Sequence, residues 1–199
     1  MTSPRELRRQ QRVATSREQI LDTAEELFGS QGYRATSLQR VAERCEFSVG
    51  ALYQFFSGKE ELLQAVMYRR GNDLFAAMRG AISPDETGVA NLVAVVEAIS
   101  AFFERFPSYG QLTIRLASPG EDAPKDLSPA GEGFAGALAL FADVLRSGQR
   151  SGDVRPGDPA ALAELASNMM TAYLRDRGSE GLTSGEFREI LSRAFSAVG

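Results

Sequence analysis

The sequence predicts an all-α protein of about nine helices, with a small N-terminal domain followed by a larger C-terminal one. Two observations support this prediction. Apolar residues recur at spacings of three and four through most of the chain, which is the period of a helix with one buried face. Helix-entry signals also recur at regular intervals, mostly a serine or threonine followed three residues later by glutamate.

The first such capping box, residues 15–18 (Thr-Ser-Arg-Glu), predicts a helix that ends near Gly32. The apolar stripe of this helix consists of Ile20, Leu21, Ala24, Leu27 and Phe28. A second box, residues 57–60 (Ser-Gly-Lys-Glu), predicts a long helix with one apolar face. A third box, residues 83–86 (Ser-Pro-Asp-Glu), predicts a further helix and places Pro84 in its first turn, where proline is favoured.

The C-terminal half continues the helical pattern. A short helix is predicted at residues 108–117, followed by a loop rich in proline, aspartate and glycine at residues 118–129. Three more helices are predicted to begin at residues 128–129 (Ser-Pro), 158–159 (Asp-Pro) and 183–186 (Thr-Ser-Gly-Glu), with a connecting loop at residues 148–156.

The composition excludes several kinds of catalytic and metal site. The chain contains no histidine and a single cysteine, Cys45. A Ser-His-Asp triad, a Cys-His pair, a histidine-based zinc site and an intramolecular disulfide are therefore excluded. We expect no enzymatic activity, no cofactor and no metal.

The charge of the chain is unevenly distributed, although its net value is −4. Residues 1–70 carry 11 Lys and Arg against 9 Asp and Glu, whereas residues 71–199 carry 11 against 17. The first dozen residues form a basic arm with Arg5, Arg8, Arg9 and Arg12. A basic N-terminal part followed by an acidic body is compatible with local phosphate contact, and equally with a solvated terminus.

No membrane segment is expected. The most apolar stretch, residues 89–106, is interrupted by polar and charged residues, so it reads as a buried helix. The first dozen residues lack the apolar run of a signal peptide. We therefore expect a cytoplasmic protein.

The most informative segment is residues 35–59. Ser37 is predicted to cap a short helix that buries Leu38, Val41 and Ala42, and Ser48 to cap a second one that buries Leu52 and Phe56. A three-residue turn at residues 45–47 joins the two helices. This is the layout of a helix-turn-helix, whose second helix enters the DNA major groove. It predicts that residues 1–58 form a three-helix DNA-binding domain, which includes the N-terminal arm.

The exposed residues of this unit are assigned to DNA. Helix N-termini at the two serines suit phosphate oxygens, and small residues at the start of the second helix permit close approach to base edges. The tyrosine, lysine and arginine side chains are phosphate candidates, and the glutamines are base-contact candidates. The predicted contacts are Arg34, Ser37, Gln39, Arg40, Ser48, Val49, Gly50, Ala51, Tyr53, Gln54 and Lys59.

The segment resembles the TetR/AcrR family of transcriptional regulators. The family pattern matches at twelve positions: Ala35, Thr36, Ser37, Val41, Ala42, Ser48, Gly50, Leu52, Tyr53, Phe56, Lys59 and Leu62. The resemblance implies a homodimeric, DNA-binding regulator, here expected to be a repressor that a small molecule releases from a pseudo-palindromic operator. Three positions depart from the pattern: Glu46 replaces a glycine of the turn, Val49 a polar residue, and Phe55 a histidine or tyrosine.

Residues 59–199 are predicted to form the helical effector-binding and dimerisation domain. Its apolar side chains could line an effector pocket, although each alone is more typical of a core. They are Phe75, Met78, Phe102, Phe103, Phe106, Tyr109, Phe134, Phe141, Met169 and Tyr173. The resemblance implies a homodimer through helices 158–175 and 184–197, although intramolecular packing would also explain their apolar faces.

Two other functions are compatible with this sequence. A helical small-molecule-binding protein that has lost specific DNA binding is suggested by Glu46 and Val49. An all-α enzyme is the second alternative, and the absence of histidine argues against it.

Overall fold

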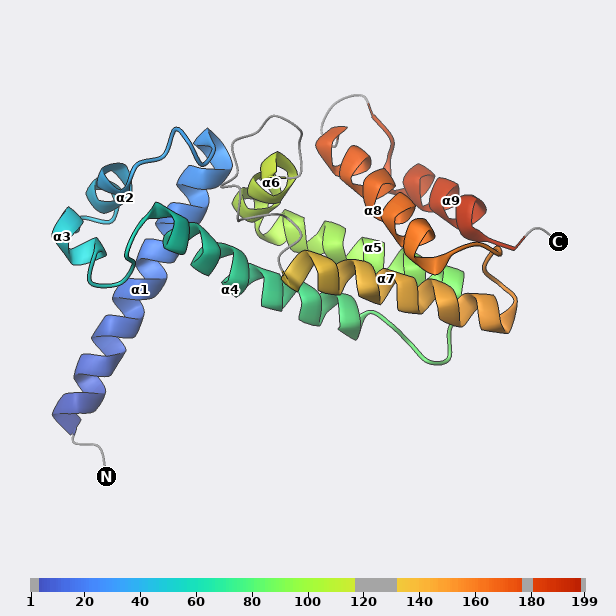
Figure 1. Ribbon diagram of the computed structural model, residues 1–199, viewed down its shortest axis with the longest axis horizontal. Coiled ribbons are helices and arrows are strands. Elements are labelled where there is room, and N and C mark those ends of the chain that lie inside the picture. Colours follow the sequence, from blue (N-terminus) through green and yellow to red (C-terminus); the bar gives the residue numbers. More distant parts are fainter. Residues whose placement is uncertain (1–3, 117–131, 177–180, 198–199) are drawn as a thin grey trace. The chain divides into compact units, whose positions relative to one another are not determined.

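The structure, a computed structural model, describes residues 4–116, 132–176 and 181–197, without the side chains of residues 4–12 and 132–134. Within these ranges the chain forms nine α-helices and one isolated antiparallel bridge, between Val154 and Ser196 (Figure 1). The helices are α1 (Pro4–Gln31), α2 (Leu38–Arg44), α3 (Val49–Leu52), α4 (Lys59–Gly80), α5 (Gly88–Arg105), α6 (Pro107–Leu116), α7 (Glu132–Ser151), α8 (Pro159–Asp176) and α9 (Ser184–Phe195). The predicted all-α fold is confirmed. The loop predicted at residues 118–129 and the helix start predicted at residues 128–129 lie outside the described residues.

The described residues divide into two compact units. The first unit consists of residues 4–70 and 106–116, and the second of residues 71–105, 132–176 and 181–197. Helix α4 contributes to both units, and α6 belongs to the first. These units are geometric, so the functional division predicted after residue 58 stays a prediction.

The core of the first unit is built from α1, α2, α3, α6 and the first part of α4. It contains the apolar stripe predicted for the first helix, together with residues of the short helices and of α4. Its buried residues are Ile20, Leu21, Ala24, Leu27, Phe28, Val41, Ala42, Cys45, Leu52, Phe56, Leu62, Leu63, Val66 and Leu112. Helix α6 approaches α1 at Gly29, where a Cβ atom would lie 2.3 Å from the carbonyl oxygen of Ser108. Only glycine allows this close crossing.

The predicted start of the first helix is wrong. Helix α1 begins at Pro4 and runs through residues 15–18 without interruption, so Thr15 is an internal residue and not a cap. The segment upstream of Thr15 contains leucine, arginine, glutamine and alanine, which are strong helix formers, and Pro4 suits a first turn. The basic arm expected at residues 5–12 is therefore the beginning of a 28-residue helix.

The cap of α4 uses a different glutamate from the one predicted. The backbone amide of Ser57 donates to Glu61 Oε2 at 2.6 Å, so Glu61 and not Glu60 closes the first turn. Hydrogen bonds from the side chain and the backbone amide of Ser57 hold the pKa of Glu61 below its usual value.

The third predicted capping box, at residues 83–86, forms a turn and not a helix start. Asn91 accepts from the amide of Ser83 at 2.8 Å and donates to the carbonyl of Ser83, also at 2.8 Å. Helix α5 begins later, at Gly88, and its cap is Thr87, whose hydroxyl oxygen accepts from the amide of Ala90. The prediction failed because the side chain of a residue inside the helix satisfies the turn.

The second unit is held together where α5 crosses α7. A Cβ atom on Gly148 would lie 2.3 Å from Val154 Cγ2, and one on Gly88 would lie 2.4 Å from Gly148 Cα. Helix α7 continues to Ser151, so the connecting loop predicted from residue 148 begins only at Gly152. The caps predicted at residues 158 and 183 are confirmed, the latter as a complete capping box.

Candidate nucleic-acid interface

Helices α2 and α3 form the predicted helix-turn-helix. Ser37 Oγ accepts from the amide of Arg40 at 3.1 Å, and Ser48 Oγ accepts from the amide of Ala51 at 3.2 Å. Behind these N-caps, α2 buries Val41 and Ala42, and α3 buries Leu52. Leu38 is only half-buried, and Phe56, predicted as part of the second helix, is buried but lies after the end of α3 and not within it. The two helices therefore turn one face toward the core of the first unit and leave the other exposed.

The turn between the two helices is strained at Glu46. This residue has φ of 61°, and it is the only non-glycine residue with positive φ in the described part of the chain. The amide of Phe47, the residue after Glu46, donates to the carbonyl of Ala42 at 2.9 Å. This hydrogen bond is typical of a helix that ends at a left-handed residue. Gln19 of α1 donates to the carbonyl of Cys45 and fixes the turn against the core. The departure noted in the sequence therefore falls on a position that favours glycine.

Replacing Glu46 by glycine is expected to stabilise the first unit by about 1 kcal/mol, because a left-handed conformation strains a residue that has a Cβ atom. The matched control is Glu46→Ala, which removes the carboxylate but keeps the Cβ atom. Urea unfolding of the three proteins measures the effect. Equal stabilisation by both substitutions would show that backbone strain is not the cause.

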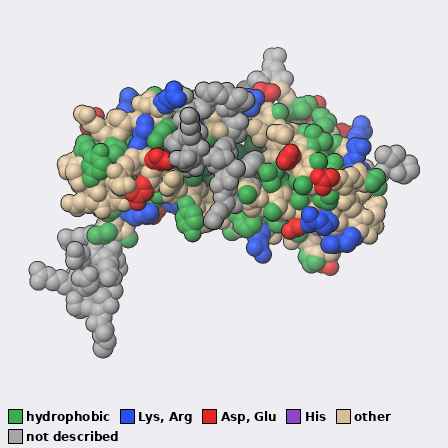
Figure 2. Space-filling model, viewed as in Figure 1, with side chains coloured by type: hydrophobic (Ala, Val, Ile, Leu, Met, Phe, Trp, Pro, Cys, Tyr) green, Lys and Arg blue, Asp and Glu red, His purple; other side chains and the backbone are tan. Residues whose placement is uncertain are grey.

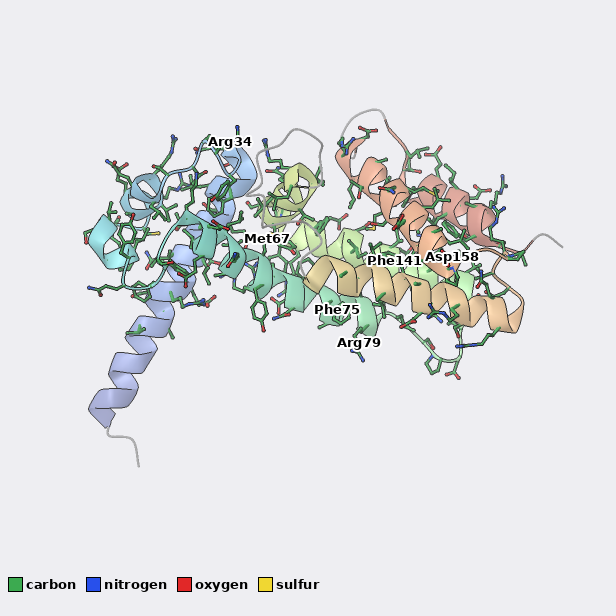
Figure 3. All side chains as sticks on the ribbon, in the orientation of Figure 1. Arg34, Met67, Phe75, Arg79, Phe141 and Asp158 are labelled. Atoms are coloured by element: carbon green, nitrogen blue, oxygen red, sulfur yellow. The ribbon has the colours of Figure 1, made fainter. Side chains whose placement is uncertain are left out.

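The exposed face of the helix-turn-helix carries most of the predicted DNA contacts. Tyr53 is 56% exposed. Gln39 is also exposed and donates to Glu43 at 3.0 Å, whereas Val49 is half-buried against the core of the first unit. Other exposed predicted contacts are Arg34, Ser37, Arg40, Ser48, Gly50 and Gln54. Figure 3 labels Arg34 just past the end of α1, in the loop that leads to α2.

One residue close to this face was missed by sequence reasoning. Arg17 of α1 lies over the ring of Phe56, with its Cζ atom 5.2 Å from the ring centroid. Its position could have been found from the helix period, because it precedes the buried residues Ile20 and Leu21 by three and four positions. Arg17 therefore places a cation against Phe56, in the segment that follows α3.

Lys59 is in a different environment from the one that the sequence suggested. Its ammonium group donates to the backbone carbonyls of Tyr33 and Thr36, both at 2.9 Å, and of Arg34 at 3.4 Å. It also lies 4.2 Å from the centroid of the Tyr33 ring. Partial burial lowers the pKa of Lys59. The side chain thus faces the loop between α1 and α2.

The predicted pocket residues are distributed over both units. Phe106 and Tyr109 belong to the first unit, and burial raises the pKa of Tyr109 to about 12. Phe75, on α4, is half-buried and labelled in Figure 3 with Phe141 of α7. The side chain of Phe134 lies outside the described residues. The others belong to the second unit, where they are buried in the core or half-buried: Met78, Phe102, Phe103, Phe141, Met169 and Tyr173.

A groove of about 170 Å³ lies among α5, α8 and α9. Its lining includes Tyr173, which stacks on Phe187 at 4.2 Å and bonds Ser184 through its hydroxyl. Of the ten predicted pocket residues, only Tyr173 lines this groove among the described residues. The predicted apolar effector pocket therefore stays a prediction.

A family model matches the helix-turn-helix and the helices around it. The model of bacterial regulatory proteins of the tetR family covers residues 20–66, from the buried part of α1 into α4. The helix-turn-helix part of this chain, residues 20–66, therefore belongs to the TetR family of transcriptional regulators.

Two curated relatives and one solved structure are similar to this regulator. The HTH-type transcriptional activator FasR of Mycolicibacterium smegmatis is 38% identical over 88 residues, which are 44% of this chain and only 40% of FasR. The HTH-type transcriptional regulator UidR of Escherichia coli is 24% identical over 168 residues, 84% of each chain. A putative regulator from Saccharomonospora viridis, solved in complex with choline, has a TM-score of 0.77 at 18% identity, over 93% of this chain and 100% of that one.

One face of the protein carries side chains of both signs of charge. Figure 2 shows acidic and basic side chains interspersed on the visible face.

Among the residues described, no helix is both long and apolar enough to cross a lipid bilayer. The same residues contain no cluster of three or more acidic or cysteine side chains that could hold a metal ion.

Proposed function

We propose that this regulator is a cytoplasmic homodimeric repressor, which binds a pseudo-palindromic operator and is released from it by a small, largely apolar effector. The observation that carries the proposal is the exposed face of α2 and α3, where two serine-capped helix N-termini stand in front of a buried core. Backbone N–H groups at such termini suit phosphate oxygens. The proposed contacts are Arg34, Ser37, Gln39, Arg40, Ser48, Val49, Gly50, Ala51, Tyr53 and Gln54.

Dimerisation through α8 and α9 is supported by the apolar side chains that these helices expose. Leu165 on α8 is 50% exposed, Ile190 on α9 is 42% exposed, and Leu182, just before α9, is 48% exposed. A second copy that covers them would form an isologous interface. Two recognition helices would then read half-sites ~34–36 Å apart.

The effector would bind in the apolar part of the second unit, to which Met78, Phe141 and Met169 belong. The similar Saccharomonospora viridis protein binds choline, which shows that a chain of this fold can hold a small molecule. The effector shifts the regulator away from DNA only to the extent that it binds the released conformation more tightly.

The proposal is tested by titrating fluorescent DNA from upstream of the protein's own gene, with anisotropy measured at several salt concentrations. We expect a specific complex of a dimer with two half-sites, whose affinity falls steeply as salt rises. Sedimentation of the free protein gives its oligomeric state. Absence of a specific, salt-sensitive complex would favour a small-molecule-binding protein without DNA affinity, the alternative suggested by the exposed carboxylate of Glu46.

Removing the hydroxyl of Tyr53 is expected to weaken operator binding by roughly 5–10-fold, because one hydrogen bond to a phosphate is lost. Since phosphates carry no sequence information, the loss should be similar for different operator variants. The matched control is Tyr68→Phe, which alters a tyrosine on α4 that is 72% exposed. Wild-type affinity of Tyr53→Phe would remove this residue from the interface.

A further inference from the structure

The contacts of Lys59 link α4 to the start of the helix-turn-helix. The loop at residues 32–37 connects α1 to α2. Three of its carbonyl oxygens, from Tyr33, Arg34 and Thr36, lie 2.9, 3.4 and 2.9 Å from Lys59 Nζ. An ammonium group has three N–H donors and no acceptor. One acceptor for each donor is therefore available within the protein.

The same loop is held from the side of α1. Thr36 is 1% exposed, and its hydroxyl lies 2.9 Å from the carbonyl oxygen of Gly32 and 3.2 Å from that of Leu27. Thr36 is thus attached to α1 through its side chain and to α4 through its carbonyl. The next residue is Ser37, the N-cap of α2. The position of Ser37 therefore depends on the hydrogen bonds of the Thr36 hydroxyl and on the one between the Thr36 carbonyl and Lys59.

We propose that Lys59 is a positioning residue for DNA binding, which fixes the loop before α2 and so orients the N-terminus of that helix, and that it is not itself a phosphate ligand. This inference rests on the proposed function. A tetrahedral ammonium group can donate in three directions at once, and three carbonyl oxygens lie within hydrogen-bond distance of Lys59 Nζ. The planar guanidinium of arginine carries the same charge but donates within one plane, so it cannot replace lysine here.

The first experiment compares Lys59→Arg and Lys59→Met in operator titrations over a range of salt concentrations. A phosphate ligand would be rescued by arginine, and its loss in Lys59→Met would lower the salt slope by ~1. A positioning residue predicts that both variants lose affinity by at least about tenfold, with the salt slope of Lys59→Met unchanged. Wild-type affinity of Lys59→Arg together with a lower slope in Lys59→Met would overturn the proposal.

The second experiment needs no substitution at Lys59. The chain contains two lysines, Lys59 and Lys125, so lysine-specific ¹⁵N labelling limits the side-chain ammonium signals to two, and Lys125→Arg leaves only that of Lys59. Ammonium protons held by three carbonyls exchange slowly with water. We expect the Lys59 signal in the free protein, and little change in it when operator DNA is added.

The two experiments separate this inference from the proposed function. A Lys59 signal that is absent from the free protein, or that appears only with DNA, would overturn the positioning role. If the wild-type protein forms no specific complex, the proposed function fails, whereas the signal in the free protein still reports the contacts with the loop.

Discussion

Glu25→Gln is expected to lower the free energy of unfolding by about 3 kcal/mol, because it removes the charge from a buried ion pair and leaves its partners buried. The side chain of Glu25 is 7% exposed, and its Oε2 atom accepts from Arg69 Nη2 at 2.8 Å and from Arg70 Nε at 2.7 Å. The side chains of Arg69 and Arg70 are only 16% and 17% exposed, and their other carboxylate partners, Glu18 and Asp22, are 56% and 60% exposed. Arg70 also lies 4.0 Å from the ring centroid of Phe106, so it cannot turn to water without losing that contact.

The matched control for this prediction is Glu18→Gln. Glu18 binds Arg69 at 2.9 Å, as closely as Glu25 does, but its side chain is 56% exposed. Exposed ion pairs contribute only about 0–1 kcal/mol, so the control should unfold nearly as the wild type does. Urea unfolding followed by circular dichroism compares the proteins. Equal effects of the two substitutions would mean that burial does not decide the strength of these pairs.

Because the Glu25 pairs join α1 to α4 within the first unit, their loss should also appear in DNA binding. We expect Glu25→Gln to lose operator affinity at a lower temperature than the wild type does. Below that temperature its affinity should be close to that of the wild type, since Glu25 is buried and cannot touch DNA.

Gly148→Ala is expected to destabilise the second unit by about 2–3 kcal/mol, because there is no room for the added methyl group. Its Cβ atom would lie 2.3 Å from Val154 Cγ2 and 2.9 Å from Gly88 Cα. The side chain of Val154 can be shortened, but the backbone at Gly88 cannot. The double variant Gly148→Ala, Val154→Ala should therefore recover only part of the lost stability.

The control for this prediction is Gly136→Ala, on the same helix. Its Cβ atom would lie 3.6 Å from Phe75 Cε2, an ordinary contact, and alanine inside a helix is favoured over glycine by roughly 0.5–1 kcal/mol. The two glycine substitutions on α7 are thus expected to have opposite signs. Calorimetric unfolding measures both, and a stabilised Gly148→Ala would contradict the close crossing of α5 and α7.

The sequence allowed prediction of those helix starts that depend only on neighbouring residues. The caps at Ser37, Ser48, Asp158 and Thr183 were predicted correctly, since each side chain bonds an amide two or three residues later. The box at residues 15–18 failed because strong helix formers upstream extend α1 past it. The box at residues 83–86 failed because a more distant side chain, Asn91, holds the turn.

The candidate site was predictable to the same extent. The helix-turn-helix and its exposed face follow from the local spacing of residues. The same spacing predicted that Glu46 occupies a glycine position, and its φ of 61° confirms this. The contacts of Lys59 could not be predicted, because its carbonyl acceptors lie 23 to 26 positions earlier in the chain. Only the packing of α4 against the loop brings these groups together.

The burial of Cys45 gives the DNA-binding unit a built-in reporter of its own opening. It is the only thiol in the chain, it is 2% exposed, and it lies in the turn between α2 and α3. Burial raises the pKa of this thiol, and a reagent such as an aromatic disulfide can reach it only when the turn opens. The rate of its modification therefore measures the free energy of local opening in the unmodified protein. Operator DNA that closes over the turn should slow this reaction, whereas effector binding should restore it.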